Sequence, residues 1–148
     1  MNELIFLVEE ADEGGYIAKA LGENIITQSE TLAELKEMVK DAVRCHFDVS
    51  QLPKWFGFIL WKKKFLLYED TAGPVSGADL IKLLKRYGFE QTRQSGSHIR
   101  LTAQKEGEYH ITIPNHSPLK IGTLSAILSD IAAHLKMSKD DLMHDLFG

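Results

Sequence analysis

The residues best suited to chemistry lie in two short alternating stretches in the second half of the chain. In HIRLTA, alternation along an expected strand puts His98, Arg100 and Thr102 on one face. In YHITIP, the same rule puts His110 and Thr112 on a matching face. Imidazole suits proton transfer near neutral pH, and guanidinium groups stabilise charge that develops on phosphate oxygens. The combination suits RNA cleavage, in which a base takes the proton of a 2′-hydroxyl and the 2′-oxygen attacks the adjacent phosphorus.

Arg93 extends this set, because it lies just before a turn at Ser95 and Gly96 that leads into the histidine. If helices cover the apolar face of these strands, the polar face is expected to be open. The same pattern also arises where polar residues simply face solvent on a half-exposed sheet. Periodicity alone favours that simpler explanation.

A second candidate is the stretch TIPNHSPLKIGTL, in which two prolines stiffen a loop carrying His116 and Lys120. The loop leads into an expected helix with Thr123 as its N-cap. Helix N-termini attract anions through free N–H groups and the helix dipole, so Lys120 could help to hold a phosphate there. The alternative is a plain structural loop with a good cap.

Composition excludes several classes of protein. The net charge of −4 gives no overall nucleic-acid signature, and the 44% hydrophobic and 26% charged residues are typical of a globular protein. Cys45 is the only cysteine, and the histidines lack zinc spacings, so we expect no disulfide within the chain, no metal site and no cofactor. The first residues lack a basic segment and a long apolar run. We therefore expect no signal peptide, no membrane span and a cytoplasmic location.

The first half is expected to fold as β-β-β-α-β-β. Thr31 and Glu34 have capping-box spacing and mark the start of a helix with an apolar stripe. Pro53 ends that helix before a strand at 55–61, and Lys62–Lys64 is expected to be the tip of a hairpin whose second strand is 65–69. The first three strands are expected at 3–10, 16–21 and 24–29.

The second half is expected to fold as α-β-β-β-α. Ser76 and Asp79 again suggest a capping box, and Gly88 is a natural residue after a helix end. We expect an α+β protein of two small domains, at 1–70 and 77–148, with a linker at 71–76. The charge is divided: residues 1–71 hold 13 acidic and 8 basic residues, whereas residues 72–136 hold 5 acidic and 8 basic. This asymmetry suggests two units with opposite electrostatic roles.

The second half resembles the HicA family of toxin ribonucleases. The resemblance rests on SGADLIKLLKRYGFEQTRQSGSHIRLT and HITIPNHSPLKIGTLSAIL, from about Ser76 to Ile131. It implies a double-stranded-RNA-binding-like fold and metal-independent cleavage of mRNA by the histidine of the G-S-H element, which is His98 here.

The first half is similar to HicB-type antitoxin domains, which have a partial RNase H-like fold. EGGYIAKAL and TQSETLAELKEMVKDAV carry this resemblance, although LGENIITQSE replaces the usual Pro-Gly-Cys stretch before the helix. The unit ends near Asp70 without a helix-turn-helix or ribbon-helix-helix segment. No DNA-binding domain is therefore expected.

Together the resemblances imply a fused antitoxin and toxin, in which the acidic half covers the RNA-binding face of the other half. Docking could occur within one chain or by swapping between chains, and a homo-oligomer is possible. The alternative is an RNA-binding or protein-interaction module of the same fold without catalysis. The expected partner is mRNA, with His98 as the general base. His110 or His116 could also donate a proton. The expected RNA-binding residues are Gly96, Ser97, Arg93, Arg100, Lys120, His110 and His116.

Overall fold

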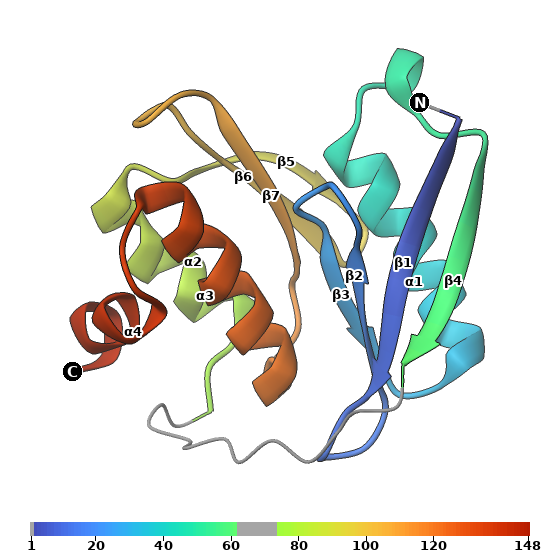
Figure 1. Ribbon diagram of the computed structural model, residues 1–148, viewed down its shortest axis with the longest axis horizontal. Helices are drawn as coiled ribbons and strands as arrows, with labels where there is room; N and C mark the ends of the chain where they lie inside the picture. The colour runs from blue at the N-terminus through green and yellow to red at the C-terminus, as the bar shows by residue number, and fades with distance from the viewer. Residues whose placement is uncertain (1, 62–73) are drawn as a thin grey trace.

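The computed structural model describes residues 2–61 and 74–148, where four α-helices and two β-sheets form a mixed α+β fold (Figure 1). This agrees with the expected fold class. The predicted Lys62–Lys64 hairpin tip, the strand at 65–69 and residues 71–73 of the predicted linker lie outside the described residues. The elements are β1 (Glu3–Glu10), β2 (Tyr16–Ala20), β3 (Ile26–Ser29), α1 (Leu32–His46), β4 (Trp55–Trp61), α2 (Gly77–Leu84), β5 (Glu90–Ser95), β6 (His98–Ala103), β7 (Tyr109–Pro114), α3 (Ile121–Leu135) and α4 (Lys139–Phe147).

The first sheet has the strand order β3-β2-β1-β4, with β1 and β4 parallel and the other pairs antiparallel. Alternation along β1 buries Leu4, Phe6 and Val8, which share an apolar cluster with residues of α1. The predicted start of α1 is confirmed, because the Thr31 hydroxyl accepts a hydrogen bond from the Glu34 N–H. The first sheet and α1 therefore form one layered unit.

The second sheet is antiparallel, in the order β5-β6-β7. Its apolar face packs against α2, α3 and α4 in a second cluster that includes Leu101, Ile111 and Leu128. In the register of β6 and β7, Arg100 pairs with Thr112, so the predicted sharing of a face across the two strands is confirmed. The predicted capping box at the start of α2 is also present in both directions.

The two sheets meet edge to edge. A parallel bridge pairs Ile25, just before β3, with Thr112 of β7, and the Thr112 N–H donates to the Asn24 carbonyl at 2.9 Å. Ile17 and Ile26 of the first sheet belong to the apolar cluster of the second half. α1 lies against both sheets, and Figure 1 shows it on the side of β5–β7 opposite to α2 and α3. The halves thus share a core.

Two predictions about the C-terminal region need correction. Thr123 is not the N-cap of α3, because this helix begins at Ile121 with Lys120 as its cap residue. The Thr123 hydroxyl is buried and has no hydrogen-bond partner within residues 2–61 and 74–148. The chain also forms a further helix, α4, that was not predicted. Its signal was available, since the Ser138 hydroxyl accepts from the Asp141 N–H at the helix start.

Candidate active site

His98 lies at the start of β6 and is completely buried, with 0% of its surface exposed. The prediction of an open polar face is therefore wrong, although His98, Arg100 and Thr112 do share that face. α1 and β3 of the first half cover it. Strand alternation identifies which residues share a face, but it cannot show which distant element covers them.

The Asp41 carboxylate of α1 binds the turn between β5 and β6. One oxygen accepts hydrogen bonds from His98 Nδ1 at 2.8 Å and from the Ser97 N–H at 2.8 Å, and the other accepts from the Ser95 hydroxyl at 3.0 Å. Gly96 has φ +50°, and a Cβ there would lie 2.6 Å from the nearer carboxylate oxygen. The turn can therefore approach the carboxylate closely only because this residue is glycine.

The other ring nitrogen of His98, Nε2, lies 2.6 Å from the Thr27 hydroxyl of β3. Burial lowers the pKa of His98 more than its hydrogen bond to Asp41 raises it, so the ring is neutral at neutral pH. Partial burial raises the pKa of Asp41, but hydrogen bonds from His98, Ser97 and Ser95 outweigh this effect and leave it below its ordinary value. A neutral ring that donates from Nδ1 to a carboxylate accepts at Nε2 from Thr27.

This Asp-His-Thr chain has the hydrogen-bond order of a hydrolase triad, but its hydroxyl is not available to a substrate. The Thr27 side chain is completely buried, so its oxygen faces no space in which a substrate could lie. The one donor and the one acceptor of the neutral His98 ring are both used by side chains of the first half. The arrangement therefore closes the site.

The two arginines bind the C-terminal end of α1. Arg93 donates to the Phe47 carbonyl at 2.9 Å and pairs with Asp48 at 2.6 Å, while Arg100 donates to the His46 carbonyl at 3.2 Å. These are the carbonyls that a helix leaves unpaired, at the negative end of its dipole. Both predicted phosphate-binding arginines are thus held by the first half.

His46 is the last residue of α1. It is buried, and its Nδ1 lies 2.8 Å from the Thr112 hydroxyl of β7. Burial and the nearby His110, Arg100 and Arg93 lower its pKa to about 4. His46 is therefore a neutral polar link between the two halves.

His110 is not brought close to His98. It pairs across the strands with Thr102, whose hydroxyl lies 2.7 Å from His110 Nδ1. Thr102 is four residues beyond His98 on β6, which corresponds to roughly 13 Å along a strand. The His110 Nε2 atom lies 3.1 Å from the Glu108 carboxylate, and the His110 ring lies 6.5 Å from the His46 ring between centroids. His110 therefore belongs to the end of the sheet beside His46.

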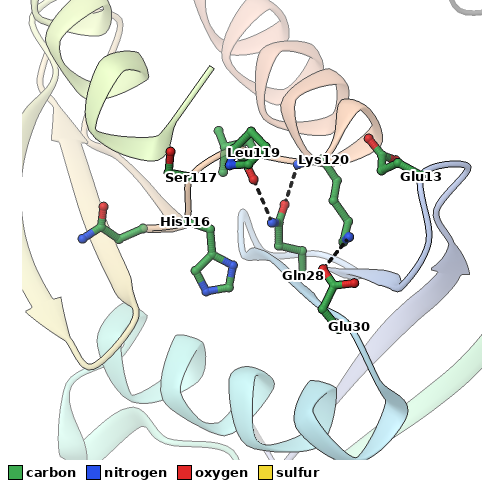
Figure 2. Close-up of a pocket in the computed structure, with 9 residues that line it drawn as sticks. Glu13, Gln28, Glu30, His116, Ser117, Leu119 and Lys120 are labelled. Atoms are coloured by element: carbon green, nitrogen blue, oxygen red, sulfur yellow. Dashed lines mark hydrogen bonds and ion pairs between the residues drawn. The ribbon is translucent and has the colours of Figure 1, made fainter. Parts of the chain in front are cut away.

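Lys120 lies at the other end of the interface, at the start of α3, and is also buried (Figure 2). Its ammonium group donates to the Gly14 carbonyl at 2.8 Å and pairs with Glu30 at 2.9 Å. The Glu13 carboxylate accepts from the Ile121 N–H at 2.8 Å. The helix N-terminus that was predicted to hold a phosphate therefore holds acidic side chains of the first half.

Gln28 links β3 to the loop before α3. Its amide oxygen accepts from the Lys120 N–H at 2.8 Å, and its amide nitrogen donates to the Pro118 carbonyl at 3.3 Å (Figure 2). His116 points into a cavity of about 620 Å³ beside these groups. Burial and then the nearby Lys120 lower the pKa of His116, and Glu30 raises it less.

Asp41, Thr27 and Gln28 were not predicted as site residues. Asp41 lies on the polar side of an amphipathic helix, and such residues usually face solvent.

In the described parts of the chain, no group of three or more His, Cys, Asp or Glu residues could hold a metal ion. None of the helices in residues 2–61 and 74–148 is long and apolar enough to cross a membrane.

Comparison with known proteins identifies the second half. Residues 77–132 match the family described as HicA toxin of bacterial toxin-antitoxin, so the chain carries a HicA toxin domain, and this domain suggests a toxin–antitoxin module. The chain belongs to the UPF0150 family. A UPF0150 protein of Archaeoglobus fulgidus is 60% identical over 58 residues, 39% of this chain and 86% of the relative. A UPF0150 protein of Thermotoga maritima is 52% identical over 47 residues, 32% of this chain and 67% of the relative. No solved structure matches the chain.

Proposed function

We propose that the chain is a fused toxin and antitoxin, with a metal-independent mRNA endoribonuclease at residues 77–148 held inactive by residues 1–70. The proposed linker between them is 71–76. The toxin half would have a double-stranded-RNA-binding-like fold, and the inhibitory half a HicB-like, partial RNase H-like fold. The observation that carries the proposal is the complete burial of His98 between Asp41 and Thr27.

In the proposed reaction His98 is the general base. It takes the proton of a ribose 2′-hydroxyl, and the 2′-oxygen attacks the adjacent phosphorus. The bond from phosphorus to the 5′-oxygen breaks, and that oxygen takes a proton from water. The products are a 2′,3′-cyclic phosphate and a 5′-hydroxyl. A neutral histidine is in the protonation state that this role requires.

Inhibition is proposed to work by direct competition. Arg93, Arg100 and Lys120 are the predicted phosphate contacts, and each is bound to a carboxylate or carbonyl of the first half. An acidic partner tethered to the same chain competes with phosphate groups at an effective concentration on the order of millimolar. RNA therefore reaches the site only when the halves separate.

The test compares RNA cleavage by the intact chain with cleavage by a fragment that begins at Val75. We expect cleavage by the fragment, none by the intact chain, and none by the fragment with His98→Ala. Adding residues 1–70 as a separate polypeptide should suppress cleavage again. Circular dichroism of each fragment checks that it is folded.

Two outcomes would reject the nuclease. A folded fragment that binds RNA without cutting it would indicate an RNA-binding module, the alternative function for this fold. A folded fragment that neither cuts nor binds RNA would indicate a protein-interaction role. RNA binding that does not weaken as salt rises would argue against phosphate recognition.

A further inference from the structure

We propose that the turn at Ser95–Ser97, together with His98 Nδ1, is a binding site for one phosphate group of the RNA backbone, in which Asp41 is a substitute for that phosphate. In the RNA complex the phosphate would take over the orienting role of Asp41 and leave His98 Nε2 free as the base. The RNA part of this inference rests on the proposed function. The anion site itself does not, because it is defined by donors that are already in place.

Three donors converge on a single anionic group. The Ser97 N–H, the Ser95 hydroxyl and His98 Nδ1 all point to the Asp41 carboxylate, at 2.8, 3.0 and 2.8 Å. Hydrogen bonds to an ionised acceptor are stronger than neutral ones. A phosphate presents oxygens of the same charge and acceptor character. The donor set belongs entirely to the second half, so it persists when the first half leaves.

Gly96 gives the site its shape. Its φ of +50° turns the backbone so that the flanking serines both face the carboxylate, and a Cβ at this residue would lie 2.6 and 2.8 Å from the two carboxylate oxygens. Any side chain there would fill the place of the anion. An ordinary tight turn needs a glycine only for its dihedral angles, as at Gly107, where a Cβ would meet nothing within 4 Å.

The two sides of the His98 ring cannot serve the same phosphodiester. Asp41 lies 2.8 Å from Nδ1 and Thr27 lies 2.6 Å from Nε2, on opposite sides of the ring. Asp41 occupies the place of a phosphate, and the Thr27 hydroxyl occupies the place of a ribose 2′-hydroxyl. The imidazole ring and the two hydrogen bonds therefore lie between that phosphate and that hydroxyl. An attacking oxygen must lie about 3–3.5 Å from the phosphorus. If Nε2 takes the 2′-hydroxyl proton, the phosphate at Nδ1 is a neighbour of the one that is cleaved.

This arrangement explains how the base is prepared. An anion at Nδ1 holds the proton on that nitrogen, so Nε2 carries the free lone pair that a general base needs. In the intact chain Asp41 supplies the anion and the Thr27 hydroxyl covers the lone pair. In the complex the RNA would supply both an anion and a hydroxyl. His98 would then keep one tautomer in the inhibited and active states.

The experiment uses the intact chain, labelled with ¹⁵N, and inorganic phosphate as the probe. Asp41→Ser removes the carboxylate and leaves room for the anion. We expect a saturable shift of the Ser97 amide signal, with an apparent phosphate affinity at least about tenfold higher than in wild type. The ring nitrogens of His98 should report the Nδ1–H tautomer with phosphate bound. Asp48→Ser, which removes a carboxylate of the same interface that contacts Arg93 instead, should resemble wild type.

Second variants separate a shaped site from general attraction. Asp41→Ser with Gly96→Ala should lose phosphate binding, whereas Asp41→Ser with Gly107→Ala, which places alanine at another positive φ, should keep it. Asp41→Asn keeps the size of the side chain and serves if the serine variant is unfolded; it should bind phosphate more weakly than the serine variant and more strongly than wild type.

The inference is overturned if a folded Asp41 variant shows no Ser97 shift, or if Gly96→Ala leaves the binding unchanged. Since the measurement involves no RNA, an inactive fragment in the cleavage assay would reject the nuclease and leave the anion site standing. If the fragment that begins at Val75 cleaves RNA but a folded Asp41 variant does not bind phosphate, only the anion site is rejected.

Discussion

His46 is expected to make the intact chain lose stability in mild acid. Its pKa is about 4 in the folded chain, against an ordinary value of 6.5, because the ring is buried beside His110, Arg100 and Arg93. Above the ordinary value the ring is neutral in the folded and unfolded states. Below the ordinary pKa, His46 binds a proton in the unfolded chain, but in the folded chain it stays neutral until the pH approaches about 4.

The magnitude follows from that difference. A pKa lowered by about 2.5 units corresponds to about 3 kcal/mol in full, of which about 2 kcal/mol is lost between about pH 7.5 and about pH 5. Glu23, whose carboxylate lies 3.6 Å from His46 Nε2, would offset part of this when the ring is protonated. The lowered pKa of His98 acts in the same direction.

Urea denaturation of wild type and His46→Asn at the two pH values measures this contribution. Asparagine can still form a hydrogen bond with the Thr112 hydroxyl but does not titrate. The free energy of unfolding of the variant should fall with acid by about 2 kcal/mol less than that of wild type. His144→Asn, at an exposed position of α4, is the matched control and should behave as wild type. Equal losses in wild type and His46→Asn would refute the reasoning.

Three further substitutions test the joint between the halves. Gly122→Ala would place a Cβ 2.5 Å from Ile17 Cδ1 and should destabilise the chain by about 1–3 kcal/mol in urea denaturation. Adding Ile17→Val removes that methyl group and should recover much of the lost stability. No recovery would show that the clash is elsewhere. Gln28→Ala loses two hydrogen bonds across the joint and should cost about 1–3 kcal/mol by the same assay, so an unchanged midpoint would count against the linking role. Asp48→Ser should leave the midpoint almost unchanged, because the carboxylate is exposed and Arg93 keeps its backbone carbonyl partners; a large drop would contradict this.

Most elements could be predicted from the sequence because their signals are local. The caps at Thr31 and Ser76 need only residues three positions further on. The start of α3 was misplaced because its free N–H groups are satisfied by the first half. Gln28 accepts from the Lys120 N–H and Glu13 from the Ile121 N–H, more than 90 residues away in each case. No short stretch of sequence contains that information.

The candidate site shows the same division. Alternation and the glycine turn were enough to place His98, Gly96 and Ser97 together, since these features are set within one hairpin. The partner of His98 could not be found in this way. Asp41 is one of several acidic residues on the polar side of α1, and only the packing of that helix against β5 and β6 distinguishes it. The residues of the candidate site are thus easier to predict than the residues that cover it.

The contacts that join the two halves also determine which conditions could separate them. Ion pairs such as Lys120–Glu30 would weaken as salt rises, but buried pairs are screened little, and apolar contacts are not weakened by salt. Ile17 and Ile26 lie in the same apolar cluster as Leu128 of α3, so separation would uncover part of the core of the second half. Exposing a fully buried aliphatic side chain costs about 1.5–3 kcal/mol. Release of His98 is therefore expected to follow unfolding or proteolysis of the first half, and raising the salt concentration alone should not start RNA cleavage by the intact chain.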